Sequence, residues 1–342
     1  MYSLIRQLLF LLPAELSHEL TFKGLDIASQ VRLLSLLVPK PRSHKVKLMG
    51  LEFDNPVGLA AGLDKNGQHI QALSELGFGF IEIGTVTPLA QSGNPKPRMF
   101  RLTDSDALIN RMGFNNEGVD ALVKNVQASR YQGVLGINIG KNKDTPLENA
   151  IDDYLICMEK VYELASYITI NISSPNTPGL RELQSGSYLT ELLDGLKAKQ
   201  LELLQATGKN TPLVLKVAPD LDQDEVQSIS NALLNSGLDG LIVSNTSIDK
   251  SLVTGQPHAD EQGGLSGQPI FDASLAVQRQ FHALLTDKIP LIAAGGIDSP
   301  DRAQQRLEGG ASLVQVYTGF IYQGPGLISE IADRVATMGH RK

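Results

Sequence analysis

The residues best suited to chemistry lie between Ile170 and Leu180, in the run INISSPNTPGL. A segment rich in β-branched residues, 167–172, leads into this run and predicts a strand. Pro175 and Pro178 fix the backbone around the serine, asparagine and threonine side chains, so these polar groups are held on a stiff loop. Such a loop after a buried strand suits the catalytic groups of an α/β enzyme. The competing interpretation is a turn that only ends the strand.

Eight short apolar segments indicate the elements that must position this loop. We expect strands at residues 56–61, 80–86, 134–139, 167–172, 212–217, 240–244, 290–294 and 312–317. Helical patterns lie between them, among others at 67–76, 148–165, 187–206 and 223–235. Apolar strands that alternate with helices are typical of a parallel sheet, and eight such units predict an α/β fold of the (β/α)8 TIM barrel type. A doubly wound sheet is disfavoured because no GxGxxG motif follows a strand.

In a barrel the C-terminal ends of all strands share one face, so the polar residues that follow the strands should meet there. Glycines follow the last two strands, and a glycine-rich run lies at 263–267. Because glycine lacks a Cβ, its backbone amide can approach a phosphate closely. The same face should collect five asparagines: Asn110, Asn138, Asn171, Asn176 and Asn245. An amide both donates and accepts hydrogen bonds, which suits the alternating C=O and N–H edge of a pyrimidine or a flavin.

Lys216 lies within the fifth predicted strand, where its ammonium would point into the barrel. A buried ammonium needs an anion or a carbonyl group as its partner. It could form a Schiff base, as in aldolases of this fold, or stabilise the negative charge of a reduced flavin. A third interpretation is an internal ion pair that caps the barrel.

The composition disfavours several classes of protein. Six histidines without metal-ligand spacing and a single cysteine, Cys157, predict neither a metal site nor an intramolecular disulfide. Cys157 lies in a helical pattern and is interpreted as a packing residue. The net charge of −7 argues against nucleic-acid binding, although residues 1–47 carry +4 and the remaining chain −11.

The basic N-terminal segment contains two apolar helical patterns, one ended by Pro13 and a second, 15–37, stopped by Pro39. The first apolar run is too short to span a bilayer. Amphipathic helices with basic residues fit a segment that lies on a membrane surface, and a helical layer packed on the barrel is the alternative. We therefore expect an N-terminal segment, residues 1–40, and a barrel domain, residues 41–342.

Four runs together resemble the dihydroorotate dehydrogenases: AGLDK at 61–65, NRMGF at 110–114, NISSPNT at 171–177 and GGI at 295–297. The N-terminal helices and Ser174 make the chain similar to the membrane-associated, quinone-dependent class 2. The soluble class uses a cysteine as its base, and Cys157 lies in a different element. The resemblance covers nearly the whole chain.

The resemblance implies an FMN enzyme that oxidises (S)-dihydroorotate to orotate in de novo pyrimidine (UMP) biosynthesis. Its electrons would pass to ubiquinone or menaquinone, and it would lie peripherally on the cytoplasmic side of the cell membrane. Ser174 would take the proton from C5 of the substrate while a hydride moves from C6 to flavin N5, with Thr177 as the candidate proton relay. A serine hydroxyl barely ionises near neutral pH, so we expect activity to rise toward alkaline pH.

The same resemblance implies three sets of binding residues. Those expected to hold FMN are Ala61, Gly62, Lys65, Thr85, Asn138, Asn171, Lys216, Ser244, Gly267, Gly296, Tyr317 and Thr318. Those expected to hold the substrate are Lys65, Asn110, Asn171, Asn176, Asn245 and Thr246, with the backbone of Arg111, Met112, Gly113 and Phe114 closing over it. His18 and Arg101 are expected near the quinone. Ser244 stands where the family has a threonine, and it keeps the hydroxyl.

Two other functions stay open from the residues alone. A Schiff-base aldolase or a phosphosugar enzyme would use Lys216 and the glycines suited to a phosphate, those at 263–267 and after the last two strands. This function leaves the asparagines and the basic N-terminal segment unexplained. A non-catalytic barrel at the membrane surface would have no use for so polar a strand-end face.

Overall fold

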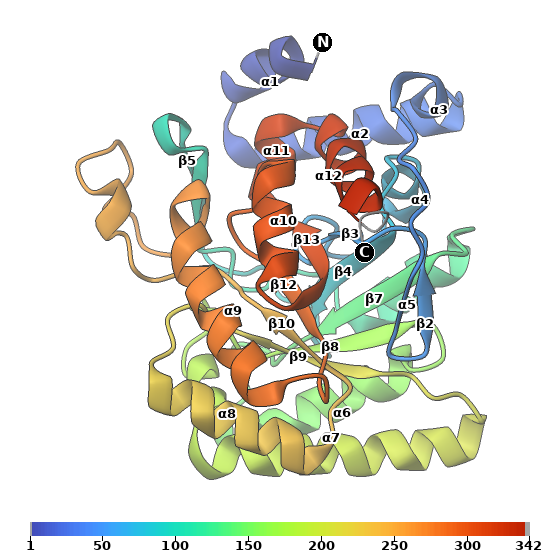
Figure 1. Cartoon of the computed structure of the whole chain (residues 1–342), viewed down its shortest axis with the longest axis vertical. Coiled ribbons are helices and arrows are strands. Elements are labelled where there is room, and N and C mark those ends of the chain that lie inside the picture. Colours follow the sequence, from blue (N-terminus) through green and yellow to red (C-terminus); the bar gives the residue numbers. More distant parts are fainter. Residues whose placement is uncertain (1, 339–342) are drawn as a thin grey trace.

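The computed structural model describes residues 2–338, and a closed barrel of eight parallel strands forms its centre (Figure 1). The barrel strands are β3 (Val57–Leu59), β4 (Phe80–Val86), β7 (Val134–Ile139), β8 (Tyr167–Asn171), β9 (Leu213–Val217), β10 (Gly240–Val243), β12 (Leu291–Ala294) and β13 (Ala311–Val316). They follow one another around the barrel in chain order, and β13 pairs with β3 to close it. The predicted TIM barrel is confirmed, and every strand lies within two residues of its expected position.

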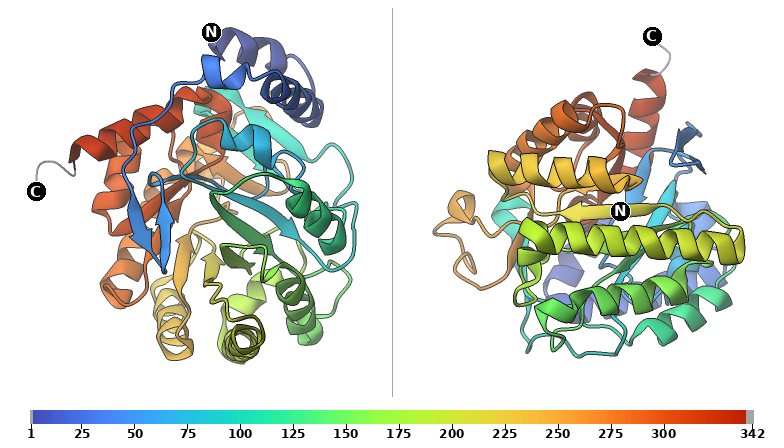
Figure 2. Two further views of the ribbon diagram at one scale, coloured as in Figure 1. Left: turned by 90° about the vertical axis from the view of Figure 1, so that its right-hand side faces the viewer. Right: turned by 90° about the horizontal axis from the view of Figure 1, so that it is seen from below.

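Helices cover the outside of the barrel (Figure 2). They are α4 (Ile70–Ser74), α5 (Val119–Ala128), α6 (Ala150–Val161), α7 (Gly186–Thr207), α8 (Gln223–Ser236), α9 (Phe271–Leu285), α10 (Pro300–Glu308), α11 (Thr318–Gln323) and α12 (Gly326–Met338). Helix α8 shows how the sequence sets the helix ends. Asp222 and Glu225 each accept the other's backbone N–H at 2.8 Å, which forms a capping box at its start. Gly237 ends the helix in the left-handed conformation, at a φ of 67°.

Two layers of side chains fill the barrel. The lower layer is apolar and consists of Phe80, Val134, Tyr167, Val214, Ile242, Ile292 and Leu313. A hairpin of β1 (Val46–Leu48) and β2 (Leu51–Phe53) closes this end, with the Phe53 ring 5.2 Å from the ring of Phe80. The upper layer is polar and includes Glu82, Lys216 and Gln315, each of which follows an apolar residue of the lower layer by two positions. Because side chains alternate along a strand, this spacing keeps both layers inside the barrel.

Two excursions from the barrel pair into a small antiparallel sheet. Its strands are β5 (Met99–Leu102), β6 (Ala107–Asn110) and β11 (Gly264–Gly267). The register places Asn110 opposite Gly264. The sheet therefore joins the run 110–114 to the glycine-rich run 263–267, two segments that are far apart in the sequence.

The N-terminal segment forms three helices where two are predicted. They are α1 (Tyr2–Phe10), α2 (Ala14–Gln30) and α3 (Leu34–Leu37), seen at the top of Figure 1. The predicted extent of the second helix is wrong because Arg32 takes a left-handed φ of 58°, which ends α2. Polar contacts tie the segment to the barrel: Glu15 pairs with Arg98 at 3.1 Å, and the Asp26 carboxylate lies 2.8 Å from Nδ1 of His69. Within residues 2–338, no helix has the length and apolar character needed to cross a membrane.

Candidate active site

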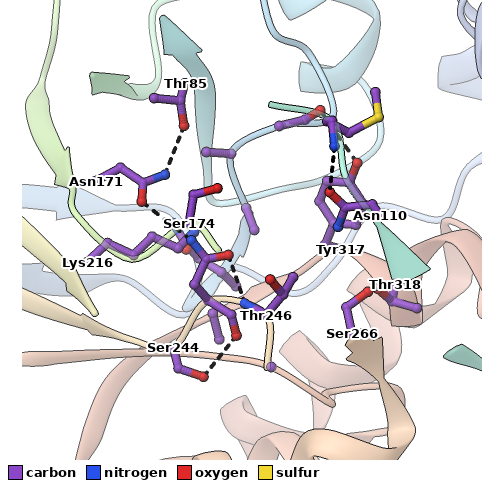
Figure 3. A pocket seen from close by; sticks show the side chains of 18 of the residues that line it. Thr85, Asn110, Asn171, Ser174, Lys216, Ser244, Thr246, Ser266, Tyr317 and Thr318 are labelled. Atoms are coloured by element: carbon purple, nitrogen blue, oxygen red, sulfur yellow. Dashed lines mark hydrogen bonds between the residues drawn. The ribbon is translucent and has the colours of Figure 1, made fainter. Parts of the chain in front are cut away.

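A cavity of about 150 Å³ lies at the C-terminal ends of the barrel strands (Figure 3). The expected cofactor and substrate residues that line it are Ala61, Gly62, Lys65, Thr85, Asn110, Met112, Gly113, Phe114, Asn171, Ser174, Asn176, Lys216, Ser244, Asn245, Thr246, Gly267, Gly296, Tyr317 and Thr318. The fold thus brings most of the residues singled out in the sequence to one place.

A directed chain of hydrogen bonds runs from Glu82 inside the barrel to this cavity. Asn138 Nδ2 donates to Glu82 at 2.8 Å, and Thr85 Oγ1 donates to Asn138 Oδ1 at 2.6 Å. Asn171 Nδ2 then donates to Thr85 Oγ1 at 2.9 Å. An ionised carboxylate only accepts hydrogen bonds, so Glu82 sets the orientation of each amide in turn. The prediction that Asn138 shares the strand-end face with the other asparagines is wrong, because its side chain points into the barrel toward Glu82.

Lys216 and Gln315 bring the polar layer into contact with the cavity. Lys216 is 5% exposed, and within the described residues its ammonium has no hydrogen bond or ion pair. Burial lowers the pKa of Lys216, and the negative charge of Glu82 opposes that shift. Gln315 Nε2 donates to Glu82 at 2.7 Å, and its buried Oε1 has no partner in the part of the chain that is described. Sequence reasoning missed Glu82 and Gln315, although a polar residue inside an apolar strand is the signal that identified Lys216.

The loop after β8 presents Ser174 to the cavity. Its side chain is 6% exposed, and its Oγ accepts a backbone N–H of the same loop at 3.2 Å. No histidine or carboxylate among residues 2–338 is hydrogen-bonded to this hydroxyl. Arg181 holds the loop by donating to the carbonyl oxygens of Ser173 at 3.1 Å and Thr246 at 2.9 Å. Thr177 lies buried in the same loop outside the cavity lining, and its Oγ1 has no hydrogen-bond partner in the described chain.

Glycines form another end of the cavity. Gly267, Gly295 and Gly296 line it together with Ser266 and Thr318, whose hydroxyls are hydrogen-bonded at 2.8 Å. At Gly296 the φ is 71°, and a Cβ would lie 2.6 Å from the backbone of Phe271 at the start of α9. Only glycine fits there without strain, so α9 packs directly against this turn, whose backbone lines the cavity. Hydroxyls and bare backbone amides are the groups that commonly bind a phosphate.

The side chain of Arg111 turns away from the cavity, and only its backbone, the part expected to close over the substrate, stays near it. Its Nη1 pairs with Glu261 at 2.7 Å, and its Nη2 donates to the carbonyl oxygen of Pro97 at 2.9 Å. Only its backbone stays close, because it connects Asn110 to Met112, which both line the cavity.

One side of the cavity faces the N-terminal helices. Lys65 lines it, and burial together with the charge of Arg98 lowers the pKa of Lys65 to about 8. His18 and Arg101, the residues expected near a quinone, lie where these helices contact the barrel and outside the cavity lining. The His18 ring lies 4.7 Å from that of Phe22, and Arg101 donates to a backbone carbonyl between α1 and α2 at 2.7 Å. Burial lowers the pKa of His18 to about 3, so its ring is neutral at physiological pH.

Comparisons with known proteins all give the same family. A sequence profile described as dihydroorotate dehydrogenase matches residues 43–338. A Burkholderia thailandensis protein named dihydroorotate dehydrogenase (quinone) is 56% identical over 98% of this chain and 97% of its own. One of the same name from Burkholderia multivorans is 55% identical with the same coverage. Among solved structures, DHODH from Eimeria tenella in complex with ferulenol is 37% identical with a TM-score of 0.87, covering 96% of this chain and 92% of that one.

Proposed function

The chain belongs to the dihydroorotate dehydrogenase family, and from this premise we propose that it oxidises dihydroorotate to orotate with a quinone as electron acceptor, using FMN. This is the oxidation step of de novo pyrimidine biosynthesis. The observation that carries the proposal is the cavity at the strand ends. It joins a serine on a stiff loop, several amides, an ammonium that has no hydrogen bond or ion pair within the described chain, and an end lined by glycines.

The lining residues fit FMN. When bound, FMN would accept a hydride from the substrate and hand the electrons on to the quinone. Gly267, Gly296 and Thr318 would hold its phosphate with backbone amides and a hydroxyl. Lys216 would place its unpartnered ammonium where negative charge develops during the reaction. The other proposed FMN residues are Ala61, Gly62, Lys65, Thr85, Asn171, Ser244 and Tyr317, and Asn138 would act on the flavin only through its hydrogen bond with Thr85.

The amides would recognise the substrate ring. Asn176 Nδ2 donates to Asn110 Oδ1 at 3.3 Å, and Asn245 Nδ2 donates to the Ser173 hydroxyl at 2.9 Å, so neighbouring side chains orient both amides. Lys65 would bind the carboxylate of dihydroorotate. The proposed substrate set is completed by Asn171, Thr246 and the run 111–114, of which Arg111 would contribute only backbone.

Ser174 would remove the proton from C5 of dihydroorotate. A serine must lose its own proton as it acts, because the free hydroxyl barely ionises at neutral pH. We propose Thr177 as the relay, since its buried Oγ1 has no other hydrogen-bond partner within the described chain. Cys157 is no substitute for the serine: it is buried in α6, where burial raises the pKa of its thiol.

We also propose that residues 1–40 attach the protein peripherally to the cytoplasmic side of the cell membrane and admit the quinone. Large apolar side chains of this segment lie exposed, among them Leu8 at 68%, Leu11 at 82% and Leu36 at 81%. An amphipathic surface of this kind buries apolar groups in lipid while its other face stays on the protein. His18 and Arg101 lie where that segment contacts the barrel, and so on the proposed quinone path.

The decisive experiment is a spectrum. Purified protein should be yellow, with the absorption of an oxidised flavin that dihydroorotate bleaches under anaerobic conditions. Lys216→Ala should lose FMN more readily and be reduced about 10-fold more slowly, as expected when an electrostatic contact is removed. A colourless protein that forms a borohydride-trapped adduct at Lys216 with a carbonyl substrate would replace this proposal by a Schiff-base function.

A further inference from the structure

The guanidinium of Arg306 carries a buried charge that no acidic side chain among residues 2–338 balances. Arg306 is 0% exposed and projects from α10 toward the ends of two barrel strands. It donates to the carbonyl oxygens of Val243 at 2.5 Å and Ala294 at 3.0 Å, and to Ser274 Oγ at 2.8 Å. All these partners are neutral, and within residues 2–338 Arg306 takes part in no ion pair. Burying a charge without a counter-ion is unfavourable, so its presence points to a use for the charge itself.

Arg302, one turn earlier on α10, provides the contrast. It donates to the carbonyl oxygen of Gly296 at 3.4 Å, as Arg306 does to that of Gly295 at 3.5 Å. Arg302 also pairs with Asp298 at 2.9 Å, which balances its charge. Two arginines of one helix therefore contact the same glycine pair, and only one of them adds net positive charge there.

The cavity itself brings no cation to these glycines. Lys65 and Lys216 are the only lysines or arginines among its described lining residues. Figure 3 shows Lys216 on the side of the cavity away from Ser266 and Thr318. At the glycine end the lining offers hydroxyls and backbone amides alone. The unbalanced positive charge nearest to a doubly charged phosphate at this end would be that of Arg306. This arginine contacts the carbonyl oxygen of Gly295 from outside the cavity.

We propose that Arg306 is a positioning residue whose charge balances the phosphate of the flavin, so that the chain binds FMN in preference to riboflavin. This inference rests on the proposed flavin function. Arg306 does not line the cavity, so it acts through the low-dielectric interior and by holding the glycine pair in place. Burial lowers the pKa of Arg306 to about 9, which leaves the guanidinium charged at neutral pH.

The test compares how flavin-free protein binds FMN and riboflavin, which differ only in the phosphate, by quenching of flavin fluorescence. In Arg306→Gln the affinity for FMN should fall about 10-fold or more, equal to about 1.4 kcal/mol, while that for riboflavin changes less than about 3-fold. Ser274→Asp gives an independent variant. It places a carboxylate where the serine Oγ now accepts from Arg306, so the charge is balanced although the arginine remains. We expect the same loss of preference for FMN.

Ser274→Ala and the double variant Arg302→Gln/Asp298→Asn, which removes both charges of one ion pair, are the matched controls, and each should keep the ratio of the two affinities within about 3-fold of the unmodified protein. An equal loss of both flavins in Arg306→Gln, with an unchanged ratio in Ser274→Asp, would show that the arginine only ties the strand ends together. If Arg306→Gln does not fold, the ratio in Ser274→Asp decides alone. An unmodified chain that binds neither flavin would refute the proposed function and this inference with it, whereas a chain that prefers FMN in every variant refutes only the role of Arg306.

Discussion

The cavity and the N-terminal segment depart from the usual distribution of side chains in opposite directions. Inside the barrel, Glu82 is 0% exposed and Lys216 is 5% exposed. On the N-terminal segment, Leu11 is 82% exposed and Leu36 is 81% exposed. Folding alone places charged groups outside and large apolar groups inside, so buried charges and an exposed apolar surface each indicate a binding partner.

The two departures select different partners. Buried amides and charges with unused hydrogen-bonding capacity suit a small polar ring, because such a ring can satisfy them. An exposed apolar face suits lipid or a molecule dissolved in lipid. The pairs Glu15–Arg98 and Asp26–His69 fix the two regions to each other, so an acceptor bound at the N-terminal segment, as proposed above, would be held next to the barrel.

The proposed reaction in the cavity depends most strongly on Ser174. In Ser174→Ala, FMN should stay bound while reduction of the flavin by dihydroorotate slows at least ~100-fold, since the proton at C5 has lost its base. Stopped-flow absorbance of the flavin measures this rate. The control is Ser185→Ala, which changes an exposed serine directly before α7. This variant should react like the unmodified protein. A Ser174→Ala protein reduced at the normal rate would remove Ser174 from the mechanism.

The membrane side depends on α1 and on Leu11 in the turn that follows it. Replacing Leu8 and Leu11 together by glutamine should lower the affinity for vesicles that contain anionic lipid by about 30-fold, because a leucine side chain loses a stabilisation of about 1 kcal/mol even when it is only partly inserted. Sedimentation with vesicles measures the binding, and flavin reduction by dihydroorotate should not change. Leu252→Gln alters a leucine of similar exposure, 69%, on a barrel loop and should have no effect. Unchanged vesicle binding in the double variant would show that the N-terminal helices only pack on the barrel and do not bind the membrane.

The fold could be predicted from the sequence where the signal was local, and the site only in part. Apolar runs predict all eight strands. The end of α2 was missed because Arg32 adopts a left-handed φ, a conformation that the sequence indicates only where glycine occupies the position. Asn138 was assigned to the strand-end face because a sequence does not show how deep in the barrel a side chain lies. Arg306 gave no signal, since a residue on an outer helix reaches the strand ends only through the tertiary packing.

Lys65 links the two regions and predicts a dependence on pH. Its pKa is lowered to about 8, so the ammonium is charged below that pH and neutral above it. If it binds the substrate carboxylate, the KM for dihydroorotate should rise about 10-fold between pH 7 and pH 10, as a charged hydrogen bond is lost. Over the same range kcat should rise, because Ser174 releases its proton more readily. In Lys65→Met the KM should be high at every pH, and a KM in the unmodified enzyme that stays flat would assign the carboxylate to another residue.

The smallest effect on substrate binding is expected at Glu82, which lies below the cavity in the polar layer of the barrel. Glutamine has the same shape, but it has both a donor and an acceptor, so it no longer forces Asn138 to donate. The chain through Thr85 can then reverse, and Asn171 would present a mixture of orientations to the substrate ring. In Glu82→Gln we expect the KM for dihydroorotate to rise about 3-fold. This change corresponds to somewhat more than half of the net free energy, about 1 kcal/mol, that one hydrogen bond contributes in a protein.

Tyr167→Phe is the matched control for Glu82, because it removes one donor to the carboxylate, 2.9 Å away, and leaves the charge in place. Its KM should therefore stay near that of the unmodified enzyme. Glu82 also opposes the shift that burial imposes on Lys216, so Glu82→Gln should lower the pKa of Lys216 further and weaken FMN retention at alkaline pH first. Should both variants show the same KM and the same FMN retention across pH, the orientation of Asn171 is fixed by its neighbours at the cavity. The polar layer would then only fill the barrel, as the apolar layer beneath it does, and would not orient groups in the cavity.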